Sequence, residues 1–180
     1  KPWSAVRINL LRRDPRGRVR WFLSATRAEM ALRGYRVTGS LRMAEEGYYR
    51  GFRAALHAAK HVRAQFYVAH TQGALPIVAR AAAHAGVSYG FDCEDLLAEE
   101  VADGLRNPAL RRAILEIERA YLPRAAYVTA TSQAMANHLA HQYQIPMPYV
   151  VRNVFPLGEL ASIPPPARRH RTGSTELVWM

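Results

Sequence analysis

Strand-like and helix-like segments alternate along this chain of 180 residues, and this alternation most constrains its fold. Short apolar segments rich in branched and aromatic residues are followed by longer segments with helical spacing, and Pro or Gly separates them. The predicted strands cover residues 6–11, 35–38, 65–69, 87–91, 125–130 and 149–151. Six alternations of this kind predict an α/β fold, in which a Rossmann-like parallel sheet carries helices on both faces.

The predicted helices lie between these strands. The first covers residues 19–33 and ends at Gly34, because glycine accepts the left-handed conformation that stops a helix. A second amphipathic helix covers residues 45–61. Further helices are expected over residues 74–85, 108–121 and 133–142. Ser132 is the expected N-cap of the last of them.

The chain changes character after Gly158. Residues 159–175 contain three consecutive prolines and a polar, arginine-rich stretch, a composition typical of a linker. Residues 176–180 are apolar again and read as the start of a strand. We therefore expect a Rossmann-like domain over residues 1–158, a Pro/Arg-rich linker over 159–175, and the start of a truncated second domain at 176–180.

The excess of positive charge lies in the first third of the chain. The whole sequence has 25 Lys and Arg against 14 Asp and Glu, a net charge of +11. Residues 1–63 hold 15 basic and 4 acidic side chains, whereas residues 64–180 hold 10 of each. Such a surface attracts nucleic acid, an anionic membrane or a phosphorylated substrate, although a solvated arginine-rich face is the alternative.

Sequence motifs exclude several kinds of site. The single cysteine, Cys93, excludes an internal disulfide framework and a cysteine-rich zinc site. The glycine-rich fingerprints of dinucleotide and P-loop sites are absent from the sequence. His57 and His61 have the spacing of a metal pair, but their helix is basic and offers no acidic third ligand. The sequence therefore predicts no metal site.

Ligands of such sheets bind beyond the carboxyl ends of the strands, and this rule selects five loops. The expected loops are residues 12–17, 70–73, 92–95, 131–133 and 152–156. His70 ends a strand, where it could bond a ligand hydroxyl, transfer a proton, or simply cap the loop. Asp92, Glu94 and Asp95 follow a strand directly, so they are candidates for a general base; stabilisation of a helix N-terminus is the alternative.

Six stretches of the chain match the pattern of a known family in their order and spacing. They are Asp14-Pro15-Arg16-Gly17-Arg18-Val19, Gly34-Tyr35-Arg36-Val37-Thr38, Ala69-His70-Thr71 with Ala74-Leu75-Pro76, Phe91-Asp92-Cys93-Glu94-Asp95, Tyr127-Val128-Thr129-Ala130-Thr131-Ser132 and Val151-Arg152-Asn153-Val154-Phe155-Pro156. Their order resembles the N-terminal domain of the family-four-like glycosyltransferases, whose GT-B fold sets two Rossmann-like domains across a cleft. Two departures are clear: the family's glycine-rich loop is replaced by Arg12-Arg13-Asp14-Pro15, and its strand-end histidine falls at Glu94.

The resemblance implies the acceptor-binding domain of a hexosyltransferase-like enzyme, which transfers a sugar from a nucleotide sugar to an acceptor hydroxyl. The roles it implies are catalysis for Asp92, Glu94 or Asp95, acceptor binding for His70, Thr71 and Ser132, the cleft and hinge for Arg152 and Asn153, and the phosphate side for Arg12, Arg13 and Arg16. No tightly bound cofactor is implied. The nucleotide-sugar donor would bind mainly to a C-terminal domain missing from this sequence, so the isolated fragment should be inactive.

The alternative interpretation is a non-catalytic Rossmann-like binding or scaffold module for anionic partners, either nucleic acid or a membrane surface. Glu94, in place of the family's histidine, favours this alternative. Nucleic acid is the weaker option, because the sequence lacks basic patches interleaved with exposed aromatics. The resemblance implies a cytoplasmic protein, with peripheral contact at the inner face of the membrane as an option. The helix at residues 45–61 could make that contact or pack on the sheet.

Overall fold

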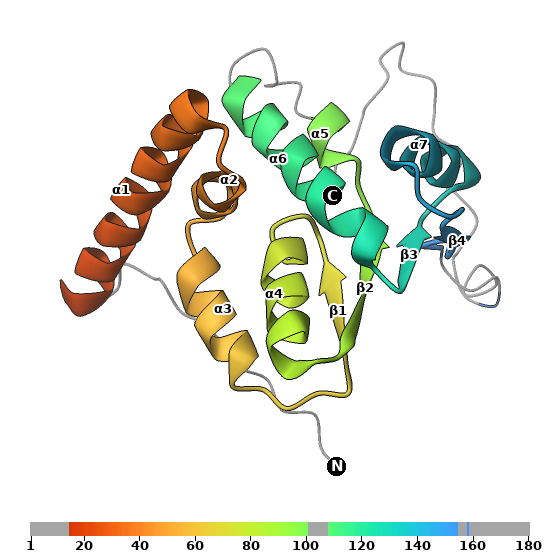
Figure 1. Cartoon of the computed structure of the whole chain (residues 1–180), viewed down its shortest axis with the longest axis horizontal. Coiled ribbons are helices and arrows are strands. Elements are labelled where there is room, and N and C mark those ends of the chain that lie inside the picture. The colour runs from red at the N-terminus through yellow and green to blue at the C-terminus, as the bar shows by residue number, and fades with distance from the viewer. Residues whose placement is uncertain (1–14, 101–107, 155–157, 159–180) are drawn as a thin grey trace, which may run out of the picture.

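The computed structural model describes residues 15–100, 108–154 and 158, and combines a group of N-terminal helices with a parallel sheet (Figure 1). The N-terminal helices are α1 (Pro15–Thr38), α2 (Leu41–Tyr48) and α3 (Phe52–Lys60). The elements of the sheet region are β1 (Phe66–His70), α4 (Leu75–Ala85), β2 (Ser88–Cys93), α5 (Leu97–Glu100), α6 (Pro108–Tyr121), the 3-10 turn η2 (Leu122–Arg124), β3 (Tyr127–Ala130), α7 (Gln133–Tyr143) and β4 (Tyr149–Val150). The described helices include none that is long and apolar enough to cross a membrane.

The four strands form one sheet in the order β1-β2-β3-β4, and every neighbouring pair is parallel. Parallel strands need crossover connections, which α4, α6 and α7 supply in turn. All four carboxyl ends therefore meet at one edge of the sheet. The predicted α/β class with a Rossmann-like parallel sheet is confirmed.

The main core lies on one face of this sheet. Alternate strand residues on that face are buried: Tyr67, Ala69, Tyr89, Phe91, Cys93, Val128 and Ala130. They pack with buried residues of α4, α6 and α7. The other face carries Phe66 and Val68, which are 38% and 50% exposed, and the ring of Phe66 stacks on Tyr127. The sequence predicts helices on both faces; within the described residues, the packed core uses one.

Two predictions for the N-terminal third are wrong. Residues 35–38 form the last turn of α1 rather than a strand, and Gly34 does not stop the helix. Tyr35 is buried beside Ala44 and Ala113, so packing against α2 and α6 outweighs the strand preference of the Val-Thr pair. The helix stops at Gly39, which has a φ of 64°.

The predicted helix at residues 45–61 is two helices, α2 and α3. The chain turns at Tyr49–Gly51, where the Arg50 guanidinium lies over the Trp21 ring of α1. Phe52 is 5% exposed and Tyr48 packs against the main core. These two apolar side chains therefore pack inside the domain, and contact of this segment with a membrane stays a prediction.

The remaining elements agree with the sequence. Gly86 ends α4 with a φ of 70°, Pro108 begins α6, and the Ser132 hydroxyl accepts a hydrogen bond from the Met135 amide at the start of α7. The strand predicted at residues 6–11, the linker at 159–175 and the second domain at 176–180 lie outside the described residues.

Candidate active site at the carboxyl edge of the sheet

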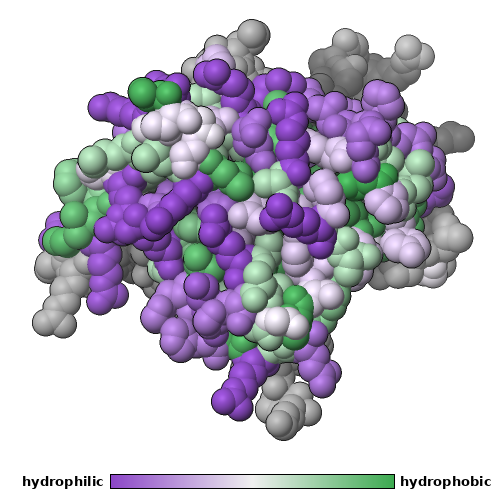
Figure 2. Space-filling view, viewed as in Figure 1, coloured by the Kyte–Doolittle hydropathy of each residue, from purple (hydrophilic) through white to green (hydrophobic). Residues whose placement is uncertain are grey.

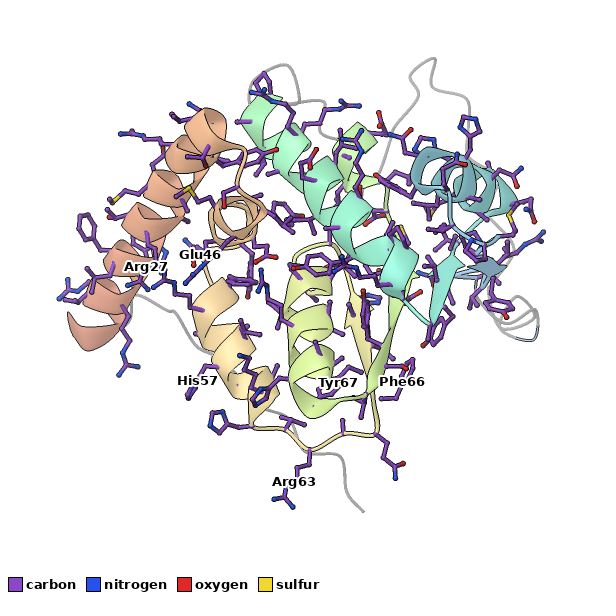
Figure 3. The ribbon with its side chains drawn as sticks, in the orientation of Figure 1. Arg27, Glu46, His57, Arg63, Phe66 and Tyr67 are labelled. Atoms are coloured by element: carbon purple, nitrogen blue, oxygen red, sulfur yellow. The ribbon has the colours of Figure 1, made fainter. Side chains whose placement is uncertain are left out.

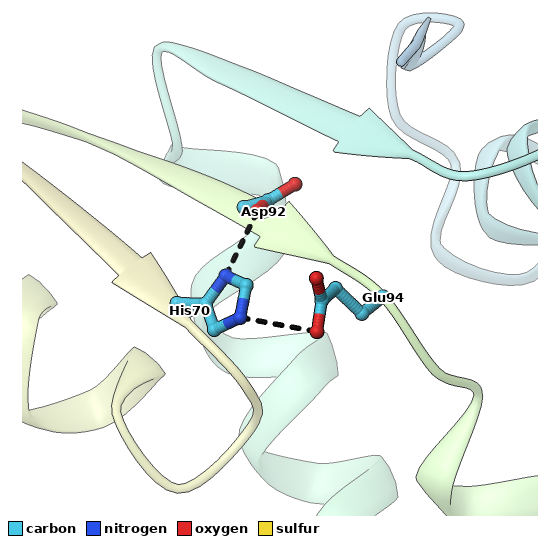
Figure 4. A group of neighbouring side chains, drawn as sticks. All are labelled: His70, Asp92 and Glu94. Atoms are coloured by element: carbon cyan, nitrogen blue, oxygen red, sulfur yellow. Dashed lines mark hydrogen bonds and ion pairs between the residues drawn. The ribbon is translucent and has the colours of Figure 1, made fainter. Parts of the chain in front are cut away.

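Three predicted site residues meet where β1 and β2 end (Figure 4). His70 and Asp92 are register partners on these strands, and His70 Nδ1 lies 2.8 Å from Asp92 Oδ2. His70 Nε2 lies 3.1 Å from Glu94 Oε2. Because side chains two residues apart point to the same face of a strand, Glu94 extends the line that Asp92 begins. One imidazole therefore bridges two carboxylates.

Thr129 binds the carboxylate oxygen of Asp92 that does not contact His70. It is the register partner of Asp92 on β3, and its hydroxyl donates a hydrogen bond to Asp92 Oδ1. Both oxygens of the Asp92 carboxylate are thus engaged, one by each neighbouring strand. The parallel register itself builds this Thr129–Asp92–His70 line across the sheet.

The carboxylates raise the pKa of His70 above its ordinary value. The hydrogen bond to Asp92 is the main cause, partial burial opposes it, and the negative charges of Glu94 and Asp92 add to the increase. An ionised carboxylate can only accept a hydrogen bond, so both ring nitrogens of His70 must carry a proton to bond Asp92 and Glu94 at the same time. The protonated imidazolium is therefore the form that this arrangement favours.

Gln72 holds the loop after His70 in place, a role that the sequence analysis missed. Its side chain is 1% exposed, and Nε2 donates to the Asp95 carbonyl at 2.8 Å and to Glu118 Oε1 at 3.2 Å. Thr71, between His70 and Gln72, has a φ of 80°, a costly conformation for a β-branched residue. The loop is thus strained next to His70 and fastened by a buried amide.

An open pocket of about 580 Å³ adjoins Glu94. Its lining residues are Glu94, Asp95, Thr131, Ser132, Gln133, Arg152, Asn153 and Val154. Five of these were predicted as site residues from the strand-end rule or the resemblance. They include two carboxylates, one guanidinium and one amide, so the pocket offers polar groups of both charges. Glu94 is the residue shared by the pocket and the His70 arrangement.

The other predicted residues are less central. Ser132 lines the pocket, but its hydroxyl caps α7. Thr71 lines a separate hollow together with Tyr48 and Tyr49. Arg16 belongs to the first turn of α1, so the loop expected at residues 12–17 is helical from Pro15 onward; the place of Arg16 on the phosphate side stays a prediction. Arg12 and Arg13 lie outside the described residues.

The His70 arrangement also bears on metal binding. One ligand atom each from His70, Asp92 and Glu94 lies within 4.8 Å of the others, close enough to share a cation. Both nitrogens of His70 already face carboxylate oxygens, and metal binding requires an unprotonated nitrogen. A cation would therefore have to displace a proton from His70. The predicted absence of a metal site stays a prediction.

Comparison with known proteins agrees with this architecture. The family model of the glycosyl transferase 4-like domain matches residues 5–158, which is most of the chain and includes every strand of the sheet. Searches of curated proteins and of solved structures give no significant match. The sheet with its strand-end site lies inside the matched range. The chain belongs to the glycosyl transferase 4-like family.

Proposed function

We propose that this chain is the acceptor-binding N-terminal domain of a glycosyltransferase, hexosyltransferase-like in activity, that uses a nucleotide sugar. The observation that carries the proposal is the juxtaposition of Glu94, held by His70, with the polar pocket that Arg152 and Asn153 line. An acceptor hydroxyl seated in this pocket would lie beside a carboxylate. Carboxylates positioned in this way act as general bases.

The reaction assigns different roles to the carboxylates. The acceptor oxygen bonds to the anomeric carbon of the donor sugar, and the bond from that carbon to the diphosphate breaks. The diphosphate leaves with the electron pair, and Glu94 takes the hydroxyl proton. Asp92 is already engaged by His70 and Thr129, so its role is to position His70. Asp95 is exposed at the pocket and orients the acceptor.

His70 acts in this proposal as a cationic clamp rather than as the base. Its raised pKa favours the imidazolium, which holds Glu94 in place through Nε2. Arg152 gives the pocket a positive charge that suits the diphosphate of the donor. By the family resemblance, a C-terminal domain would supply most of the donor site.

Sugar transfer by the full-length protein tests the proposal. A screen of nucleotide sugars for thermal stabilisation first identifies the donor, because a ligand of the folded state raises the melting temperature. Glu94→Gln should then lower kcat about 10²–10⁴-fold, the usual contribution of a general base. Glu116→Gln, an exposed exchange of the same kind on α6, is the matched control and should keep activity within about twofold.

The same experiment separates the alternative function. If no nucleotide sugar stabilises the full-length protein or is turned over by it, the catalytic proposal fails and a scaffold or binding module takes its place. If a donor is turned over and Glu94→Gln leaves kcat unchanged, Glu94 is not the base. Loss of activity in Glu116→Gln as well as in Glu94→Gln would show a general structural effect and would also remove Glu94 as the base.

A further inference from the structure

Two adjoining hollows form a groove across the helices of the domain. The first, of about 630 Å³, lies between α1 and α2, and the second, of about 420 Å³, lies between α2, α3 and α4. Arg42, Glu46 and Arg53 line both hollows, so the two meet at these side chains. The lining of this helical groove comes from residues 23–31, 40–46, 52–60 and Arg80, and it shares no residue with the candidate active site.

Exposed apolar side chains form part of the groove walls. Leu23 and Met30 of α1 are 55% and 67% exposed, and Met43 of α2 is 37% exposed. A Cβ added to Gly34 would lie 2.6 Å from Met43 Sδ, so the missing side chain at Gly34 lets Met43 lie close against α1. Methionine side chains are flexible and adapt to partners of different shape. The α1–α2 end of the groove is therefore suited to receive apolar side chains.

The groove also carries more cations than carboxylates. Glu45 is fully buried and bound to Arg80, so it offers no charge to a ligand. Glu46 accepts two hydrogen bonds of 2.9 and 3.0 Å from Arg53. The Lys and Arg side chains of the lining are Arg27, Arg42, Arg53, Lys60 and Arg80, and its carboxylates are Glu45 and Glu46. The charge that remains is positive.

Most of this positive charge faces solvent. The side chains of Arg42 and Arg53 are 75% and 54% exposed, whereas that of Glu46 is 9% exposed. Arg27 is exposed and has no carboxylate partner among the described residues. Figure 3 shows Arg27 of α1 and Glu46 of α2 near each other, and Figure 2 shows hydrophilic side chains around hydrophobic ones where α1, α2 and α3 lie in Figure 1.

We propose that the helical groove binds an acidic, amphipathic segment of another protein. Apolar side chains of that segment would pack on Leu23 and the two methionines, in the manner of a helix seated in a groove. Its carboxylates would pair with Arg27, Arg42 and Lys60, which lie along the groove. Charge complementarity therefore defines the partner. The inference is independent of the proposed transfer reaction, because the two surfaces share no residue.

Other anionic partners match only one property of the groove. A nucleic acid strand would pair with the arginines, but the described lining offers it no exposed Phe, Tyr or Trp to stack on, since Phe52 is 5% exposed. It would also leave the apolar walls uncovered. The surface of a bilayer is broad and would leave the hollows unfilled. An acidic protein segment with apolar side chains fills the hollows and neutralises their charge.

Fluorescence anisotropy of a labelled peptide with the 180-residue chain tests the proposal. The probe is a helical peptide of about 15 residues, with leucines along one side and glutamates on the other. It should bind, and added salt should weaken the binding. A peptide with lysines in place of the glutamates should not bind measurably, and one with serines in place of the leucines should bind about tenfold more weakly.

Substitutions in the groove should change the affinity in both directions. Arg27→Gln with Arg42→Gln should weaken binding of the acidic peptide about tenfold or more. Glu46→Gln should strengthen it about threefold or more, because it releases Arg42 and Arg53 from a carboxylate. A gain of affinity is a result that general damage to the fold does not produce. Circular dichroism checks that each variant is folded.

Arg63→Gln with Arg124→Gln is the matched control, because it removes two exposed charges outside the groove. Figure 3 shows Arg63 pointing away from α1 and α2. This variant should bind the peptide like the wild type. No binding of the acidic peptide, an equal loss in the control, or unchanged binding in both groove variants would overturn the proposal.

Other probes decide between the proposed partner and the alternatives. A single-stranded oligonucleotide or phosphatidylglycerol vesicles that bind more tightly than the peptide, and lose binding in Arg27→Gln with Arg42→Gln, would overturn the proposal and assign the groove to nucleic acid or to a membrane. Concentration-dependent dimers that the same variant abolishes would overturn it in favour of a second copy of the chain. Weaker binding of all these probes than of the acidic peptide supports the proposal.

Discussion

Two buried glutamates lie in different parts of the molecule and are satisfied in different ways. Glu45 of α2 is fully buried and accepts hydrogen bonds from Arg80 Nε and Nη2 on α4, at 2.9–3.1 Å, and from the Tyr121 hydroxyl on α6. Glu118 of α6 is 2% exposed and accepts from two neutral donors, Gln72 Nε2 and the Tyr143 hydroxyl. Glu45 has a cation as its partner, whereas Glu118 accepts from uncharged donors among the described residues.

The difference separates an ion pair from a hydrogen-bonded group whose pKa is shifted. The Glu45–Arg80 ion pair joins the N-terminal helices to the sheet region. Burial raises the pKa of Glu118, although its two hydrogen bonds oppose this effect. Since the Gln72 amide donates to both Glu118 and the Asp95 carbonyl, the group with the raised pKa is connected to the candidate site through one side chain.

Loss of the Glu45–Arg80 ion pair should have the largest effect on the free energy of unfolding. Glu45→Ala removes a fully buried carboxylate from an Arg80 side chain that is itself 39% exposed, so the cost should lie at or below the about 3–5 kcal/mol that breaking a fully buried pair costs. Urea unfolding at pH 7 measures the change in the free energy of unfolding. A loss below about 1 kcal/mol would contradict this account, because it would mean that solvent replaces the carboxylate at little cost.

Glu118→Gln should have a smaller effect whose sign depends on pH. The raised pKa means that the folded protein binds the Glu118 proton more tightly than the unfolded chain does. The stability that this group contributes is therefore present below its unfolded pKa and is lost as the pH rises through its folded pKa. The amide of the variant does not titrate, so the variant has no such loss at high pH. At pH 4, where the wild type keeps this contribution, the exchange should lower the free energy of unfolding by about 1 kcal/mol.

The free energy of unfolding of Glu118→Gln should then improve relative to the wild type as the pH rises to 8. Urea unfolding of both proteins at a series of pH values gives the difference directly. A difference that stays constant with pH would contradict the raised pKa of Glu118. Glu45→Gln is the comparison variant, since it removes the charge that Arg80 pairs with.

An exposed pair gives the smallest expected effect and serves as the reference. Glu29 and Arg33 on α1 are 55% and 72% exposed and lie 3.1 Å apart. Solvent screens such pairs, so Glu29→Gln should change the free energy of unfolding by no more than about 0.5 kcal/mol. The same unfolding assay measures it. A loss comparable to that of Glu45→Ala would show that burial does not explain the contrast between these pairs.

Much of the sheet region could be predicted from the sequence, because its signals are local. Branched and aromatic runs mark β1, β2 and β3, and Gly86 and Ser132 end and begin helices through their own backbone and side-chain chemistry. The N-terminal third was harder to predict. Tyr35 to Thr38 has the composition of a strand, but Tyr35 is held between α2 and α6, and this packing keeps the segment helical.

The candidate site was predictable only in part. The rule that ligands bind at strand ends selects His70, Asp92 and Glu94, because it depends on the order of elements alone. Thr129 contributes through register, and Gln72 through contacts with residues 23 and 46 positions away. No local pattern marks such partners. They depend on which strands become neighbours and which helix covers them.

The sequence by itself determined the alternation of strands and helices, the edge at which site residues gather, and the concentration of positive charge in the first third. These properties follow from composition and spacing along the chain. Only the tertiary structure decided that one imidazole bridges two carboxylates and that residues 35–38 continue α1. Both outcomes depend on long-range packing: the first on which strands become neighbours and in which register, the second on the burial of Tyr35 against α2 and α6.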